Sequence, residues 1–270
     1  MLKSKTNADK REHFLQLCSP LNEHFSKIKR MKKHAHTVLL RATRFLGHGD
    51  PRSAKLWFVG LEEPVPLQKI SDLNELPTDI FRTRNGCAGT STAVYAIISK
   101  LIMSLQGDTA PNDWRTYRDN RLFAAGSEVF LTNLYPLGKK IEKDWPRQYQ
   151  KWLGMTREEY YRWIQRDAPQ RFNFLKEQRQ HYGQPLTICF GKRHWPHFAR
   201  CFQLQDELFH DTTRFRCYPE AGMVMTEFFR STRMPGESIT ALVKWINDQG
   251  LNPYRPSKTK RAVTKRSRSQ

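Results

Sequence analysis

The sequence contains no cysteine pair spaced for metal binding. Its five cysteines form no CxxC motif and no Cys/His cluster of the kind that holds zinc or iron–sulfur groups. We therefore predict no metal cluster and no cofactor. An odd number of dispersed cysteines, in a chain without an export signal, indicates reduced cytosolic thiols that serve mainly in packing. These residues are Cys18, Cys87, Cys189, Cys201 and Cys217.

Long apolar runs are also missing. The mean hydropathy is −0.72, and no run of apolar residues is long enough for a transmembrane helix. The first residues, Met1 to Lys5, are followed by polar residues instead of the apolar segment of a signal peptide. We expect a cytoplasmic protein of the bacterial cytosol or nucleoid, with no membrane partner.

Acidic residues are scarce. The chain has 46 Lys and Arg residues against 26 Asp and Glu residues, which gives a formal net charge of +20. This excess predicts a nucleic-acid partner, because neutralising phosphates releases counterions and strengthens binding. An anionic membrane surface is a weaker alternative, since no basic helix has a clean apolar face. We predict a monomer that binds DNA in a basic groove.

Three segments of different character divide the 270 residues. Residues 1–50 predict a basic helical N-terminal extension packed on the core, and its lysine-rich side is either solvated or in contact with DNA. Residues 51–252 predict an α/β domain, because the chain is 38% hydrophobic and has seven Trp residues for a core. Residues 253–270 predict a disordered tail, which holds seven basic residues and no acid from Tyr254 onward.

Short apolar runs alternate with helical patterns along the middle segment. This alternation predicts an α/β fold with a mostly parallel central sheet and helices on both faces. The connections are predicted to be a break at 47–51, a long loop at 64–90 and a polar connection at 107–120. The predicted strands lie within 55–60, 127–138, 185–191 and 222–229, and the predicted helices are 93–105, 145–181, a short one after 192, and 238–248.

Polar residues gather where these strands end. Ligands of open α/β sheets bind outside the carboxyl ends of the strands, so these residues are candidates for a site. Each also has an ordinary explanation, such as a solvated carboxylate or a turn. The groups are Glu62 and Glu63, Asn133 and Tyr135, Lys192 to His194, and Arg230 to Arg233.

Residues from about Lys55 to Gly250 resemble the uracil-DNA glycosylase superfamily. The segment Gly60-Leu61-Glu62-Glu63-Pro64 is similar to the family motif that positions or activates water. Leu131-Thr132-Asn133 is similar to the strand end whose Asn reads the flipped base. Phe229-Arg230-Ser231-Thr232-Arg233 corresponds to the late loop that enters the minor groove and helps to expel the base.

This resemblance implies a monofunctional DNA glycosylase. Cleavage of an N-glycosidic bond builds positive charge on the sugar and negative charge on the base, so a carboxylate is needed beside the sugar. We assign that role to Glu62, with Glu63 as the alternative, and base binding to Asn133, Phe81 and Tyr135. DNA contacts are assigned to Lys192, Arg193, His194, Arg230, Ser231, Thr232 and Arg233.

Two departures from the family pattern bear on the substrate. The late loop has no His, and the first motif carries two glutamates. Divergent members include phage-defence enzymes that excise glucosylated hydroxymethylcytosine, and the 64–90 loop and the 145–181 insertion could widen a pocket for so large a base. The substrate is therefore expected to be a modified or damaged pyrimidine. The alternatives are a uracil-DNA glycosylase of base excision repair, a non-catalytic DNA-binding module, and a Mg²⁺-dependent nuclease.

Overall fold

The computed structural model describes residues 39, 43–62, 81–83, 87, 93–107, 113–138, 144–167, 170–205, 210–211, 214–230 and 232–255. Most of the predicted N-terminal extension, most of the 64–90 loop and most of the basic tail lie outside these residues, as do Glu63 and Ser231.

Two compact units make up the chain, and each is described by itself. The first, here called the aromatic unit, comprises Met1–Phe45, Glu62–Thr78 and Tyr135–Phe172. The second, the sheet unit, comprises Leu46–Leu61, Asp79–Leu134 and Asn173–Gln270.

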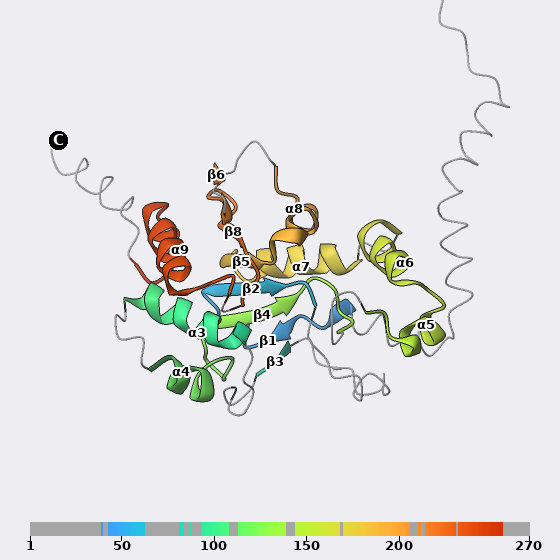
Figure 1. Cartoon of the computed structure of the whole chain (residues 1–270), viewed down its shortest axis with the longest axis horizontal. Coiled ribbons are helices and arrows are strands. Elements are labelled where there is room, and N and C mark those ends of the chain that lie inside the picture. The colour runs from blue at the N-terminus through green and yellow to red at the C-terminus, as the bar shows by residue number, and fades with distance from the viewer. Residues whose placement is uncertain are drawn as a thin grey trace, which may run out of the picture. The chain divides into compact units, whose positions relative to one another are not determined.

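The sheet unit is built on a mixed, mostly parallel β-sheet with strand order β3-β1-β4-β2-β5-β8-β7-β6 (Figure 1). Its four central strands, β4, β2, β5 and β8, are parallel to one another, while β1 pairs with β4 and β7 pairs with β8 in antiparallel fashion. The α/β prediction is thus confirmed. The strands are β1 Gly47–His48, β2 Leu56–Gly60, β3 Phe81–Arg82, β4 Val129–Asn133, β5 Leu186–Phe190, β6 His210–Asp211, β7 Phe215–Tyr218 and β8 Met223–Thr226.

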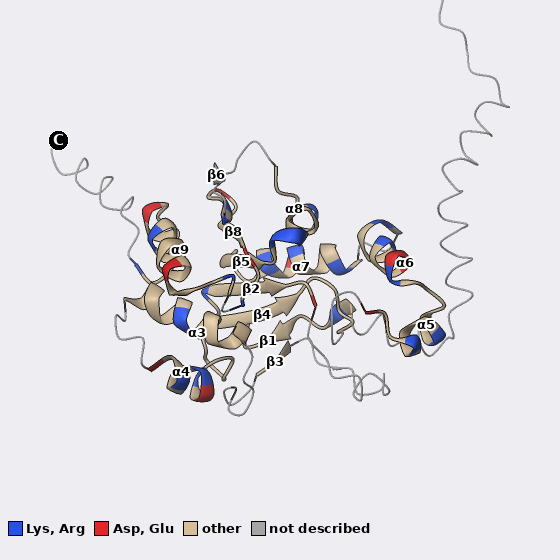
Figure 2. Cartoon of the chain, viewed as in Figure 1, with Lys and Arg blue, Asp and Glu red and all other residues tan. Residues whose placement is uncertain are grey.

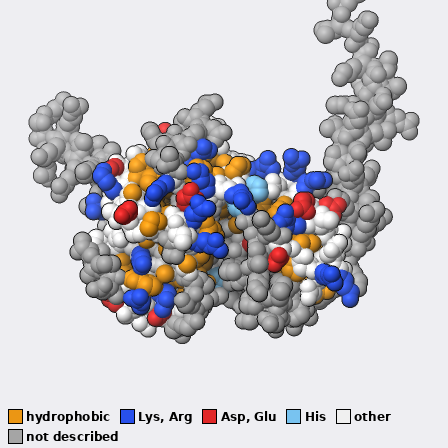
Figure 3. Space-filling view, in the orientation of Figure 1, with side chains coloured by type: hydrophobic (Ala, Val, Ile, Leu, Met, Phe, Trp, Pro, Cys, Tyr) orange, Lys and Arg blue, Asp and Glu red, His pale blue; other side chains and the backbone are white. Residues whose placement is uncertain are grey.

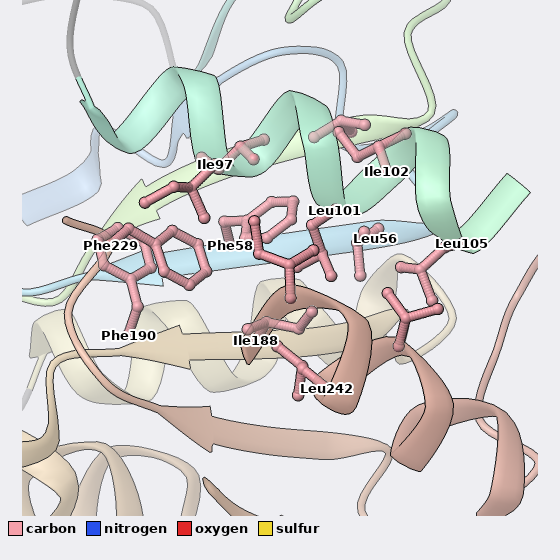
Figure 4. Packing of buried hydrophobic residues seen from close by; sticks show 14 of the residues in the cluster. Leu56, Phe58, Ile97, Leu101, Ile102, Leu105, Ile188, Phe190, Phe229 and Leu242 are labelled. Atoms are coloured by element: carbon pink, nitrogen blue, oxygen red, sulfur yellow. The ribbon is translucent and has the colours of Figure 1, made fainter. Parts of the chain in front are cut away.

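Helices α3 (Ala93–Gln106) and α9 (Gly236–Asp248) pack on one face of this sheet. Side chains alternate across a strand, so Leu56 and Phe58 of β2 face these helices while Trp57 and Val59 face the other way. Figure 4 shows Leu101 of α3 and Leu242 of α9 among the residues in this layer. Complete burial of β2 explains why its sequence is a continuous apolar run.

The opposite face of the sheet is contacted by the sheet-unit part of α7 (Gln170–His181) and the residue that follows it. The guanidinium Nε of Arg179 donates to Oγ1 of Thr187 in β5 at 2.7 Å. The Tyr182 ring lies 6.2 Å from the Trp57 ring. Helix α8 (Trp195–Phe202) follows β5, and its Trp195 indole N–H donates to the Thr226 carbonyl at the end of β8.

The polar connection predicted at 107–120 is wrong, because Trp114–Asn120 form helix α4. Two aromatic residues hold it to the core: Tyr117 is buried, and the Trp114 ring packs against the core and lies 4.9 Å from the Lys100 ammonium. The break predicted at 47–51 likewise contains β1. Gly47 permits this strand, since a Cβ there would lie 2.1 Å from the Leu131 carbonyl oxygen.

The helical stretch predicted at 145–181 consists of several shorter helices. In the aromatic unit these are α5 (Arg147–Leu153), α6 (Arg157–Arg162) and a π-helix at Trp163–Asp167. Gly154 ends α5 with a φ of 65°, a left-handed conformation that glycine adopts readily. Thr156 and Glu159 then form a capping box that begins α6.

No helix within the described ranges combines the length and the apolar character needed to cross a bilayer.

Candidate functional site

The strand order defines a topological switch point in the sheet unit. From β2 the chain proceeds to β4 on one side, and from β5 it proceeds to β8 on the other side. In open α/β sheets such a reversal leaves a crevice outside the carboxyl ends of the two strands. The segments at that position are Gly60-Leu61 at the end of β2 and Gly191 to His194 after β5.

Gly60 is the point where three strand ends meet. A Cβ at Gly60 would lie 2.7 Å from Oδ1 of Asn133 in β4 and 2.8 Å from the Phe190 ring in β5. The Leu134 amide donates to the Gly60 carbonyl at 2.9 Å, which extends the β2–β4 pairing past Asn133. Only glycine leaves room here, so the Asn133 amide and the Phe190 ring approach the end of β2 from both sides.

Aromatic side chains form one wall of this edge. The Phe190 ring stacks on Phe229 at a centroid distance of 4.5 Å and an interplanar angle of 9° (Figure 4). Phe228, with its ring 6.0 Å from that of Phe190, is 42% exposed, while Phe190 and Phe229 are buried. An exposed phenylalanine beside a buried aromatic stack offers a flat apolar surface at the edge of the sheet.

The turn after β5 carries the predicted DNA-binding residues Lys192, Arg193 and His194. It begins at Gly191, whose φ of 126° favours glycine and whose amide donates to the Thr226 carbonyl at 2.9 Å. Lys192 and Arg193 are exposed and His194 is half-buried. Figure 2 shows Lys and Arg, in blue, in the segment that leads into α8.

The turn after β8 carries the second predicted group. Its backbone is fixed by the Arg230 carbonyl, which accepts from the amides of Arg233 at 3.0 Å and Met234 at 2.7 Å. Buried Met234 anchors the turn, while Arg230, Thr232 and Arg233 are exposed. Ser231 lies outside the described residues.

Glu227 is a candidate that sequence reasoning missed. The strand predicted to run to residue 229 ends at Thr226, so Glu227 is the first residue beyond it. Its Oε1 lies 3.9 Å from the Lys192 ammonium, and its side chain is 21% exposed. The change from the apolar run Met223–Met225 to a carboxylate could have revealed this position as a strand end.

Phe81 lies elsewhere in the sheet unit. It belongs to β3, which β1 and β4 separate from β2, so about 14 Å lies between the β3 and β2 strand axes. The Arg52 guanidinium lies 5.3 Å from its ring centroid. Phe81 is therefore not brought to the Gly60 junction.

Glu62 and Tyr135 belong to the aromatic unit. The Tyr161 hydroxyl of α6 donates to Oε1 of Glu62 at 2.7 Å, and Glu62 is half-buried. The Tyr135 hydroxyl accepts from Nε2 of Gln165 at 2.6 Å. Tyr135 itself is buried, with its ring 4.5 Å from that of Tyr161.

Burial and the nearby Glu62 carboxylate act together on the tyrosines of this unit. Both effects raise the pKa of Tyr149, Tyr160 and Tyr161, with burial the larger cause in each case. Each hydroxyl therefore keeps its proton at neutral pH, and the Tyr161 hydroxyl acts as a donor to the carboxylate.

The structure thus brings Asn133 to the end of β2, at the switch point that the turn after β5 borders. Glu62 follows Gly60 by two residues along the chain but is described within the other unit. That Glu62 and Asn133 share one site stays a prediction, and Glu63 lies outside the described residues. On the face drawn in Figure 3, Lys and Arg side chains are widely spread, with fewer acidic ones between them.

Among the described residues, no group of three or more His, Cys, Asp or Glu side chains is arranged to hold a metal ion. Comparison with known protein families, with curated proteins and with solved structures finds no match to this chain.

Proposed function

We propose that the protein is a monofunctional DNA glycosylase that removes a flipped-out modified or damaged pyrimidine and leaves an abasic site. One observation carries the proposal: Gly60, Asn133 and Phe190 converge at the switch point of the sheet, and basic turns follow β5 and β8. This edge combines a base-reading amide, an aromatic surface and cations for phosphate, which are the components that a flipped base requires.

The reaction that we propose is hydrolysis at C1′ of the deoxyribose. Water attacks C1′, its proton passes to a carboxylate, and the C1′–N bond breaks with its electrons leaving on the base. Glu62 is the group assigned to orient the water, because it lies two residues after Gly60 in the sequence. Its carboxylate is half-buried, so water screens its charge less than it would screen an exposed one. The Tyr161 hydroxyl donates to its Oε1 at 2.7 Å and so fixes the orientation of the carboxylate.

Base recognition is assigned to Asn133. Its amide offers both a donor and an acceptor, which matches the two kinds of group on a pyrimidine edge. The exposed Phe228 ring adds a surface on which a base can stack. Flipping a base out of the duplex costs about a few kcal/mol, and stacking and hydrogen bonds in the pocket must offset that cost.

Stabilisation of the departing base needs a cation or a hydrogen-bond donor. The late loop supplies Arg230 and Arg233 in place of a histidine, and Lys192 lies on the turn after β5. The same residues are suited to phosphate contact, because each presents an exposed charge on a backbone turn fixed by hydrogen bonds.

Within this class we favour glucosylated hydroxymethylcytosine of phage DNA over uracil. Two departures from the pattern of the uracil enzymes support this preference: the first motif carries two glutamates, and the late loop has no His. Such an activity would act in antiviral defence.

The decisive experiment incubates the full chain with duplexes that carry uracil, glucosylated hydroxymethylcytosine or unmodified cytosine, and then measures alkali-labile strand breaks. Release from a modified duplex in the presence of EDTA is expected, without a borohydride-trapped adduct. Glu62→Gln should lower the rate by about 100-fold or more. Glu220→Gln, the same change at an exposed turn residue, should leave the rate unaltered.

Other outcomes identify the alternatives. Salt-sensitive DNA binding without release of any base would indicate that the protein is a non-catalytic DNA-binding module. Uracil release with no action on the glucosylated base would assign the protein to uracil repair. Strand cleavage that requires Mg²⁺ would replace the glycosylase proposal with a nuclease.

A further inference from the structure

A cavity of about 210 Å³ lies in the sheet unit at the amino-terminal edge of the sheet. Its lining comes from α7, from the end of α8, and from the segments that precede β5 and β8. It therefore lies at the edge opposite Gly60 and Asn133, which end their strands. The lining residues are Lys176, Arg179, Gln180, Gln184, Phe202, Gln203, Leu204, Ala221 and Met223.

Arg179 is the buried charge of this cavity. Arg179 is only 6% exposed, and burial lowers the pKa of its guanidinium to about 10. Its Nε donates to Thr187, and its Nη2 donates to the carbonyls of Pro185 at 3.1 Å and Ala221 at 2.5 Å. All of these acceptors are neutral.

Within the described part of the chain, no carboxylate forms an ion pair with Arg179. The nearby Cys189 thiol supplies no negative charge, because burial raises its pKa well above the usual value and keeps it protonated. Buried cations in proteins are normally paired, since an isolated charge loses much of its solvation free energy. The positive charge of the Arg179 guanidinium is therefore not balanced by an anion among the described residues.

Lys176 adds a second positive charge to the same cavity. Residues 176, 179 and 180 share one face of α7, because side chains three and four positions apart lie together on a helix. The Lys176 ammonium donates to Oε1 of Gln203 at 3.1 Å, again a neutral acceptor. The other polar side chains of the lining are the amides of Gln180, Gln184 and Gln203, which can donate hydrogen bonds to an anion.

We propose that this cavity is a binding site for a small oxyanion of the phosphate class. Arg179 would supply charge and Nη1, which has no acceptor among the described residues, while Lys176 and the glutamine amides would complete the set of donors. Two sources share this chemistry: a free phosphate or phosphomonoester, and a phosphate of the DNA backbone. The site is separate from the proposed catalytic edge and does not depend on the glycosylase assignment.

The experiment titrates inorganic phosphate into the full-length protein at constant ionic strength, with chloride as the reference, and follows binding by calorimetry and by thermal shift. Saturable binding with a rise in Tm is expected, because a ligand that binds only the native state stabilises it. Binding that chloride reproduces at equal ionic strength would overturn the proposal.

Gln203→Glu is the informative variant. It places a carboxylate of the same shape beside Lys176, so it should supply the missing anion and weaken phosphate binding by about tenfold or more. Lys176→Gln should weaken binding in the same direction by removing a charge. Arg179→Gln would address the buried charge directly, but Arg179 also ties β5 to β8 and its loss could prevent folding.

Gln148→Glu is the matched control, since it makes the same change of charge at an exposed position of α5. It should retain the affinity for phosphate. Equal affinity in Gln203→Glu, Lys176→Gln and Gln148→Glu would contradict the site.

A second arm distinguishes the two sources. Phosphate binding that persists when the protein is saturated with a DNA duplex supports a free phosphate or phosphomonoester. Loss of phosphate binding on addition of the duplex, together with weaker DNA binding by Gln203→Glu than by Gln148→Glu, supports a backbone phosphate.

Discussion

The hydroxyl of Tyr161 donates a 2.7 Å hydrogen bond to the carboxylate of Glu62, 99 residues earlier in the chain. The contact joins helix α6 to a residue two positions after the end of β2 in sequence. It gives an acidic side chain, singled out by its position after a buried strand, a fixed partner within the aromatic unit. The relationship can be tested by stability measurements, independently of any enzymatic activity.

Tyr161→Phe should lower the free energy of unfolding by about 1–3 kcal/mol, because a half-buried carboxylate loses a charge-assisted hydrogen bond. In a double-mutant cycle with Glu62→Ala, measured by denaturant unfolding, the two effects should be non-additive by about 1 kcal/mol. Tyr149→Phe is the control, since the Tyr149 hydroxyl donates to the Gly138 carbonyl instead. Strict additivity of Tyr161→Phe with Glu62→Ala would contradict the interaction.

Alkaline pH should unfold the aromatic unit as its tyrosines ionise. The pKa values of Tyr149, Tyr160 and Tyr161 are raised in the fold above the ordinary value of 10.0. Their contribution to stability is therefore complete below pH 10 and is lost as the pH rises further, because the unfolded chain releases protons that the native state retains.

This expectation is checked by recording tyrosinate absorbance and far-ultraviolet circular dichroism over the same alkaline titration. The absorbance step of these three residues, identified by its loss in the Tyr149→Phe and Tyr161→Phe variants, should coincide with the loss of helical signal. Ionisation of the three residues in a protein that keeps its full circular dichroism would show that their hydroxyls are accessible.

Gly60→Ala should disturb the junction of β2, β4 and β5. The added methyl group would lie 2.7 Å from Asn133 Oδ1 and 2.8 Å from the Phe190 ring, so at least one of them must move. We expect a loss of about 1–3 kcal/mol of stability by chemical denaturation. The rate of base release should fall further than stability alone explains, because Asn133 is displaced.

Gly236→Ala serves as the control for that substitution. Gly236 begins α9, and a Cβ there meets no atom within 4 Å. The control should match or exceed the wild-type stability, since alanine favours the helix more than glycine does. Equal behaviour of the two variants would mean that the β2 end tolerates a side chain.

Arg193→Ala and Arg230→Ala should each weaken DNA binding and reduce the slope of log affinity against log salt by about 1. Both side chains are exposed on turns at the carboxyl edge of the sheet. Lys244→Ala is the control, because the Lys244 ammonium already pairs with Asp248 on α9. Fluorescence anisotropy over a range of salt concentrations measures the slopes, and a slope unchanged in both arginine variants would remove these turns from the interface.

The sequence predicted the central strands well because their signal is local. Leu56–Gly60 and Leu186–Phe190 are buried along their whole length, and such strands appear as uninterrupted apolar runs. Strands β1 and β3 have two residues each, too few for a pattern, and they exist only because other strands lie beside them. Helix α4 was hidden by its polar sequence, since packing of Trp114 and Tyr117 rather than periodicity holds it in place.

The candidate site was predictable only in part. The position of Asn133 at a strand end could be predicted from the sequence. The end of β8 was predicted three residues too late, so Glu227 was missed as a strand-end residue. The cavity around Arg179 could not be predicted, because its lining joins Lys176, Gln203 and Ala221 through tertiary contacts. Arginine on a polar helix face gives no sign in the sequence that the fold will bury it.

The outermost strands of the sheet are short. β3 and β6, at the two ends of the strand order, have two residues each and expose few backbone groups for pairing. A long open edge would recruit strands from neighbouring molecules and seed aggregates. The parallel core is instead flanked on both sides by shorter segments, which offer a neighbouring molecule little backbone to pair with.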